Sequence, residues 1–184
     1  MMYLNELLTK KDVVKTINQN MDALLYYVPE VNYMIGFDQR EPQQNYDLWN
    51  HVLLSLYRTE EIKCDDVDVR LALLLHDIAK PMCFVEGEVR TYPDYADESA
   101  KTSYKILRRL NYSDKEINKI LYLVRNHNRA ISDTLINRKP ELAFKLYEVQ
   151  YCDALAQNQK YLSRRMNYLS LTKKKIIKRS NITK

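Results

Sequence analysis

The sequence contains little glycine and little cysteine. Gly36 and Gly87 are the only glycines in 184 residues, whereas glycine makes up about 7% of an average protein. A chain with so few residues suited to tight turns is typical of an all-α protein. The three cysteines, Cys64, Cys83 and Cys152, are widely spaced and form no CxxC pair. This spacing argues against a disulfide framework and against a structural zinc site.

Long apolar runs are absent as well. No stretch of the sequence approaches the roughly 18 apolar residues that a transmembrane helix requires. The first residues, MMYLNELLTKKDVVK, also lack the basic segment followed by an apolar run that marks a signal peptide. We therefore expect a cytoplasmic protein with reduced thiols and no membrane partner.

Positive charge is concentrated at one end of the chain. The net charge is +5, and the last fourteen residues contain six basic side chains and no acidic one: Lys173, Lys174, Lys175, Lys178, Arg179 and Lys184. The rest of the chain is therefore close to neutral and carries no general signature of nucleic-acid binding. We expect residues 171–184 to form a basic tail. A solvated or disordered end is its ordinary behaviour, and RNA contact is the alternative.

Apolar residues recur at helical spacing through most of the chain. The pattern predicts a single domain, with an N-terminal helical segment over residues 1–28 packed on a core that extends from 29 to 170. Helices are expected at 47–58, 67–79, 96–110, 114–127, 140–158 and from 162 onward. Residues 36–46 are expected to form a long irregular loop, and loops of this length are often functional. Gly87 is placed to turn a short hairpin, and Ser113 with Glu116 matches a capping box.

The helix expected after Val67 carries the main anomaly of the sequence. Its residues are apolar on every side, which predicts complete burial, yet it ends on the adjacent pair His76 and Asp77. An unpaired carboxylate or imidazole in a core costs several kcal/mol unless it is hydrogen-bonded or bound to a metal. We therefore expect partners for both side chains inside the fold.

Other polar residues also fall on inward helix faces. Together with the pair above they form a set of five: His51, His76, Asp77, His127 and Asp153. Any one of them alone is more often a hydrogen-bonded core residue. In a helical domain, however, side chains from facing helices commonly build metal sites, and the joint pattern favours a site for one divalent metal. The ligand types do not distinguish Mn, Fe, Ni, Mg or Zn.

The order of these residues carries a family resemblance. His51, then His76-Asp77, then Asp153 resembles the His…His-Asp…Asp signature of the HD-domain metal-dependent phosphohydrolases. Five segments also resemble the HD domain of bacterial CCA-adding tRNA nucleotidyltransferases. They are GFDQREPQQNYDLWNHVLLSL, LALLLHDIAKP, ILRRLNYSDKEI, LVRNHN and CDALAQN. The resemblance implies an all-α, single HD-domain bundle of about seven to nine helices. The stretch before Met34 has no room for the nucleotidyltransferase head, so we expect a free-standing HD domain.

The resemblance also implies roles for individual residues. His51, His76, Asp77 and Asp153 correspond to the metal ligands, and the metal would lower the pKa of a bound water. Lys80 stands where the family often has a basic residue near the substrate phosphate. Its alternative role is that of a cation at a helix end. His127 corresponds to a histidine that contacts the substrate or a second metal.

Two positions depart from the family pattern. Tyr95 and Gln43-Gln44 stand where relatives often have histidines. Because these histidines accompany a second metal, we predict one metal ion.

The function implied is hydrolysis of a phosphomonoester or phosphodiester, with a small phosphorylated substrate of the nucleotide or RNA-end type. The alternatives are a non-catalytic module that binds RNA or a nucleotide, and a purely structural histidine cluster.

Overall fold

The computed structural model describes residues 2–180, and side chains are described for residues 4–179. Within this range every long element is a helix, and the extended structure is limited to one antiparallel bridge between Val85 and Thr91. The prediction of an all-α fold is confirmed, and the bridge lies where Gly87 was expected to turn a hairpin. No described helix is both long enough and apolar enough to cross a bilayer.

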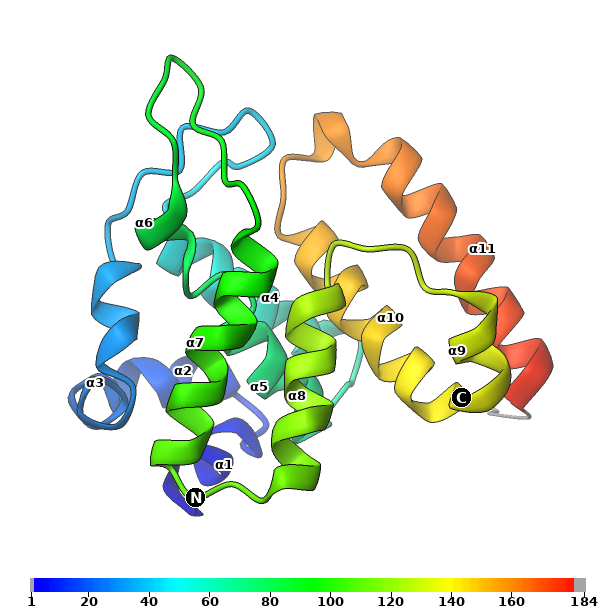
Figure 1. Cartoon of the computed structure of the whole chain (residues 1–184), viewed down its shortest axis with the longest axis horizontal. Coiled ribbons are helices and arrows are strands. Elements are labelled where there is room, and N and C mark those ends of the chain that lie inside the picture. The colour runs from blue at the N-terminus through cyan, green and yellow to red at the C-terminus, as the bar shows by residue number, and fades with distance from the viewer. Residues whose placement is uncertain (1, 181–184) are drawn as a thin grey trace.

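The helices differ greatly in length (Figure 1). Six have nine or more residues: α4 (Leu48–Glu61), α5 (Val67–Leu75), α7 (Tyr95–Arg109), α8 (Asp114–Asn126), α10 (Pro140–Leu155) and α11 (Ser163–Ser180). The others are single turns or pairs of turns: α1 (Met2–Leu8), α2 (Val13–Gln19), α3 (Met21–Tyr27), α6 (Lys80–Cys83), α9 (Asp133–Arg138) and the 3₁₀ segments η1 (Pro29–Tyr33) and η2 (Gln159–Tyr161). The long helices alone form the bundle that the apolar spacing predicts.

Helix α5 is the centre of this bundle. It contacts α1, α4, α7, α8 and α10, and every residue from Val69 to Leu75 is buried. The Asp66 side chain caps its first turn by accepting hydrogen bonds from the Asp68 and Val69 amides. The buried Arg70 guanidinium donates to the carbonyls of Leu8 and Lys10, at 2.7 and 2.8 Å, and so ties the N-terminal segment to the centre.

The end of α5 differs from the prediction. The helix stops at Leu75, and a turn over residues 76–79 leads into the short α6, in which Pro81 occupies the first turn. Proline was expected to stop the helix, but here it begins a new one, because the first turn of a helix needs no amide hydrogen from that residue. The turn places His76 and Asp77 side by side at the end of a buried helix.

Two helix hairpins cover α5. Helices α7 and α8 pack together on one side, and α10 and α11 on another (Figure 1). The Ser113–Glu116 capping box that opens α8 is present, and Trp49 is buried in the core. Tyr104 of α7 is about half exposed and lies off the inner face of this helix. The true inner face follows Ala100, Ser103 and Leu107.

The basic C-terminal stretch is helical up to Ser180. Leu169, Thr172 and Ile176 are buried, and α11 packs on α9 and α10. Residues 171–180 are therefore helical and not disordered, while the basic side chains of Lys173, Lys174, Lys175, Lys178 and Arg179 are exposed, as a solvated stretch requires. An apolar residue every third or fourth position gives this stretch one buried face in spite of its charge. Residues 181–184 lie outside the described range.

Candidate metal centre

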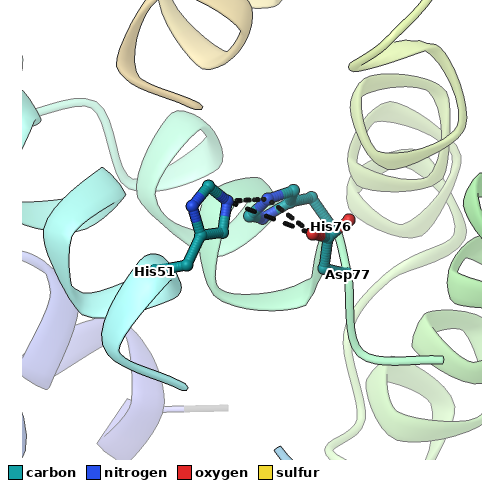
Figure 2. A group of neighbouring side chains, drawn as sticks. All are labelled: His51, His76 and Asp77. Atoms are coloured by element: carbon teal, nitrogen blue, oxygen red, sulfur yellow. Dashed lines mark hydrogen bonds and ion pairs between the residues drawn. The ribbon is translucent and has the colours of Figure 1, made fainter. Parts of the chain in front are cut away.

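Three helical elements converge on one point at the C-terminal end of α5. His51 projects from α4, His76 and Asp77 follow α5, and Asp153 comes from the last turn of α10. Figure 2 shows the two imidazole rings facing each other beside the Asp77 carboxylate. His51 Nε2 lies 3.3 Å from His76 Nε2 and 3.2 Å from Asp153 Oδ1. His76 Nε2 lies 3.5 Å from Asp77 Oδ2 and 3.7 Å from Asp153 Oδ1.

The hydrogen bonds of the histidines determine which nitrogen is free. His76 Nδ1 lies 2.7 Å from the Leu73 carbonyl, so it carries the proton and donates it. The other ring nitrogen, Nε2, therefore faces His51 Nε2 and the two carboxylates. Lone pairs that face each other in a core repel unless a proton or a cation lies between them.

The donor set fits a transition-metal ion. Imidazole nitrogens and carboxylate oxygens bind such ions at about 2.0–2.2 Å, so neighbouring ligand atoms stand about 3–3.5 Å apart. The separations among His51, His76, Asp77 and Asp153 lie in or just above this range. His51, His76 and Asp77 meet the geometric requirements of a three-ligand metal site. Asp77 Oδ1 and His51 Nδ1 are buried and have no hydrogen-bond partner among the described residues.

Both carboxylates are held in their charged form. Burial by itself raises the pKa of Asp77, but electrostatic interactions with His76, Lys80, His127 and His51 outweigh burial and lower the pKa to about 2. Burial likewise raises the pKa of Asp153, whereas the hydrogen bond from His51 and the surrounding histidines bring it well below its ordinary value. Two permanent negative charges therefore face the shared point between the rings.

Lys80 is buried beside Asp77. Its Nζ lies 3.0 Å from Asp77 Oδ2 and 3.0 Å from Gln39 Oε1, and it sits over the rings of Tyr92 and Tyr95 at 4.9 and 5.0 Å. Burial alone lowers the pKa of Lys80, but Asp77 and its other neighbours raise it above the ordinary value. The ammonium is thus charged at neutral pH and fixed in position.

His127 faces the same space from the end of α8. Its Nδ1 donates to the Val124 carbonyl at 2.6 Å, and its Nε2 accepts a hydrogen bond from the Tyr95 hydroxyl at 3.2 Å. Asn128 Nδ2 in turn donates to the Tyr95 hydroxyl at 3.1 Å. Burial and the neighbouring His76 lower the pKa of His127 to about 4, so the ring is neutral. Tyr95, which replaces a histidine of the family pattern, thereby orients His127.

A cavity of about 180 Å³ joins these groups to the surface. Its walls include Asp77, Lys80, Tyr95, His127 and Asp153, all of which the sequence singled out. Gln43 and Gln44, noted in the sequence as departures from the family pattern, also line it, together with residues that carried no sequence signal as single positions: Glu41, Asn128, Gln157, Tyr161 and Arg165. Glu41, Gln43 and Gln44 belong to the 36–46 loop, whose length had indicated a function. Arg165 carried no signal, because a basic residue at the start of a helix is common.

The fold thus brings together every residue that the sequence proposed for the site. His51, His76 and Asp77 form the tight cluster. Asp153 Oδ1 lies 3.2 and 3.7 Å from the Nε2 atoms of the two histidines, and Lys80 and His127 flank Asp77. The groups come from residues up to about a hundred positions apart in the chain. Buried polar groups are normally hydrogen-bonded, so the two buried atoms without a partner among the described residues, His51 Nδ1 and Asp77 Oδ1, are unusual for ordinary core packing.

Comparison with known proteins agrees with this arrangement. A family model described as the HD domain matches residues 48–171, and a search of curated proteins found no match. The matched segment begins with α4 and ends within α11, so it contains the elements that carry the six predicted site residues. The match covers more than half of the chain and coincides with the His/His/Asp cluster. The chain therefore belongs to the HD-domain family, whose members are in general metal-dependent phosphohydrolases.

Proposed function

We propose that the protein hydrolyses a phosphomonoester or phosphodiester with one divalent metal ion held by His51, His76, Asp77 and Asp153. The observation that carries the proposal is the shared point faced by two imidazole nitrogens and two charged carboxylates. A bound divalent ion would supply a Lewis acid and a water of lowered pKa. The ligand types leave Mn, Fe, Ni, Mg and Zn as candidates.

The residues beside the cluster suit a phosphate substrate. The charged Lys80 ammonium lies at the wall of the cavity, and the Arg165 guanidinium lines the same space. Fixed positive charge of this kind stabilises the negative charge that develops on phosphate oxygens during the reaction. The buried Lys80 is held by Asp77 and Gln39, so its position costs no reorganisation when the substrate binds.

His127 supplies a proton acceptor at the cavity wall. Its neutral ring has Nδ1 fixed by the Val124 carbonyl, so Nε2 is the basic atom that faces the cavity. The hydroxyl of Tyr95 donates to this nitrogen and keeps the ring in place. A water or a protonated phosphate oxygen that took the place of the Tyr95 hydroxyl would donate its hydrogen bond to His127 Nε2, which is already oriented to accept it.

The cavity favours a small reacting group. A volume of about 180 Å³ accommodates a phosphoryl group and the atoms next to it, and the rest of the substrate must lie outside. The amide side chains of Gln43, Asn128 and Gln157 offer hydrogen bonds around it. We favour a nucleotide or RNA-end substrate, in line with the sequence resemblance to the HD domain of CCA-adding enzymes, and a cytoplasmic setting.

Metal content is the direct test. Untagged protein should contain about one equivalent of a transition metal by elemental analysis, and Asp77→Asn should lose it. Metal-loaded wild type should hydrolyse members of a panel of nucleotides, 2′,3′-cyclic phosphates and generic phosphodiesters, and His76→Ala should not. A protein that takes up none of the candidate metals on reconstitution would refute the proposal.

The alternative is a non-catalytic module that binds RNA or a nucleotide. The exposed basic residues of α11 favour it. It predicts stoichiometric RNA binding that His76→Ala leaves unchanged, with no turnover by metal-loaded protein. The purely structural cluster predicts neither metal nor ligand, and only a loss of stability in Asp153→Ala.

A further inference from the structure

A second cavity adjoins the metal cavity. It has a volume of about 380 Å³ and is lined by Arg129, Ala130, Tyr161, Arg164, Arg165 and Tyr168. Tyr161 and Arg165 line both cavities. The two spaces are therefore neighbours, separated only by these side chains.

The chemistry of the second cavity differs from that of the first. Three arginines and two tyrosines line it, and no acidic residue does. Arg165 is anchored by a hydrogen bond from its guanidinium to the His127 carbonyl at 2.9 Å, and Arg129 is paired with Asp97. Arg164 is exposed and has no hydrogen bond or ion pair with the described residues. Cationic side chains interleaved with aromatic rings suit a ligand with both phosphates and flat bases.

The first turn of α11 forms one wall of this cavity, and one face of the helix extends away from it. Residues 164, 168, 171, 175 and 178 follow at steps of four and three, so they lie in one row along the helix. The row reads Arg164, Tyr168, Leu171, Lys175 and Lys178. Tyr168 is half-buried, and the other four are exposed.

This row, which we call the α11 row, carries positive charge at both ends, with Arg164 at one end and Lys175 and Lys178 at the other. Lys178 has no hydrogen bond or ion pair among the described residues, and Lys175 is weakly paired with the exposed Asp133 at 3.4 Å. At a rise of 1.5 Å per residue, Arg164 and Lys178 are about 21 Å apart along the helix. Helix α11 runs along one edge of the molecule beside α10, so the row follows an outer surface (Figure 1).

We propose that the substrate is the end of a single-stranded nucleic acid. Its terminal phosphate enters the metal cavity, the adjoining base stacks against Tyr161 and Tyr168 in the second cavity, and the following phosphates lie along the α11 row. This inference rests on the proposed phosphohydrolase function and specifies its substrate class. A mononucleotide would leave the α11 row unused, whereas a strand contacts cavity and row together.

Binding can be measured apart from turnover. A fluorescent single strand of about ten nucleotides, within the usual site size of such proteins, carries a 3′-phosphate and is titrated with the full chain in the presence of a chelator. Fluorescence anisotropy at several salt concentrations gives the dissociation constant. RNA and DNA strands of the same sequence form the two arms of the experiment, because phosphates and bases are common to both.

The test variant is Arg164→Gln/Lys175→Gln/Lys178→Gln, which removes three charges from the α11 row. The control is Lys15→Gln/Lys105→Gln/Lys115→Gln, which removes three charges from exposed lysines of α2, α7 and α8. The test variant should bind at least about tenfold more weakly, and the slope of log affinity against log salt should fall by about 0.7 for each charge removed. The control should bind nearly as the wild type does.

Tyr161→Ala tests the stacking site independently of charge. Loss of one base-stacking ring should weaken binding about tenfold without changing the salt slope. Circular dichroism verifies that each variant is folded. Equal weakening by the two triple variants, or no binding of either RNA or DNA by the wild type, would overturn the proposal. Failure of the phosphohydrolase proposal would appear separately, as the absence of turnover of a small phosphodiester by metal-loaded wild type.

Discussion

The two ends of α5 both carry clusters of charged side chains, but they are built differently. At the N-terminal end, Asp68 Oδ2 lies 2.7 Å from Lys119 Nζ and 2.5 Å from Lys145 Nζ. Lys145 also lies 2.7 Å from Asp66 Oδ2. At the C-terminal end, the ring nitrogens of His51 and His76 face each other and two carboxylates. In the first cluster both carboxylates meet a lysine, whereas in the second the buried Asp77 Oδ1 and His51 Nδ1 have no hydrogen-bond partner among the described residues.

This difference indicates that the charged cluster at one end of α5 serves stability and the cluster at the other end serves function. Opposite charges in the first cluster satisfy one another at a partly exposed site, so the cluster contributes modestly to stability. The second cluster is buried, and two of its polar atoms, His51 Nδ1 and Asp77 Oδ1, have no hydrogen-bond partner among the described residues, which costs folding free energy. We therefore expect substitutions at the two ends to affect different measurements.

The largest effect is expected for Asp153→Asn at the C-terminal end. The substitution keeps the shape of the side chain but removes one charged ligand, so turnover should fall about 10³-fold and metal content should drop. Steady-state kinetics and elemental analysis provide the measurements. Asp68→Asn is the matched control and should leave both unchanged. Equal losses in the two variants would mean that the ends of α5 are not functionally distinct.

The next effect is expected for Lys80→Met. Removing the fixed ammonium should lower the turnover number about 10²-fold, while the metal content stays near that of the wild type. Lys119→Met removes the corresponding lysine at the other end and should affect stability alone. If Lys80→Met retained full turnover in metal-loaded protein, the lysine would be only a cation at the start of α6 and a partner for Asp77.

A smaller effect, on stability, is expected for Asp68→Asn. It loses charge-assisted hydrogen bonds with Lys119 and Lys145 at a site that water partly screens, so the free energy of unfolding should fall by about 1–2 kcal/mol. Urea denaturation followed by circular dichroism measures the difference. If the unfolding free energies of wild type and Asp68→Asn differed by less than the precision of the fit, water would screen the charge interactions of this cluster completely.

The difference in unfolding free energy between wild type and Asp68→Asn should depend on pH. Burial raises the pKa of Asp68, but the hydrogen bonds and charges of Lys119 and Lys145 outweigh burial and lower it. A lowered folded-state pKa stabilises the protein above the unfolded value of about 3.9, and this contribution is lost as the pH falls through the folded value. The stability difference between wild type and Asp68→Asn should therefore be constant from about pH 7 to 5 and narrow below about pH 4. Parallel urea titrations across this range test it, and a difference that grew in acid would contradict the sign.

The smallest effect is expected for Tyr95→Phe. The variant removes one hydroxyl, which donates to His127 and accepts from Asn128, so turnover should fall less than about tenfold and stability by about 1 kcal/mol. Because the ring is retained, its contact with Lys80 should persist. A loss as large as that of Lys80→Met would place the tyrosine hydroxyl among the groups that act on the substrate.

Much of the site was predictable from chain order because the polar residues interrupt apolar patterns. His76 and Asp77 end a helix that is apolar on every side, and Asp153 stands on an inner face that is otherwise apolar. Burying such polar residues costs folding free energy, so their presence on inward faces indicates a functional site. The spacing of three and four residues indicated the face that each helix buries, and hence which polar residues point inward.

Other features depended on contacts between distant segments. Tyr95 meets His127 across 32 positions, and Gln39 reaches Lys80 across 41. The C-terminal stretch was expected to be a solvated or disordered tail because of its charge, but its sparse apolar residues pack on α9 and α10. The sequence of this stretch does not show how much apolar surface the neighbouring helices offer for its burial. The packing of residues 171–180 could therefore be seen only in the tertiary structure.

The sequence by itself indicated the helical class, the buried centre of the bundle and five polar residues on inward faces, because apolar periodicity and polar interruptions are local properties. Lys80 was added by the family resemblance. Only the tertiary structure decided that the histidine nitrogens share one point, that Tyr95 orients His127, and that the α11 row continues from a cavity beside the metal site. These relations are distances between segments remote in the chain, and they are fixed by how the helices pack around α5.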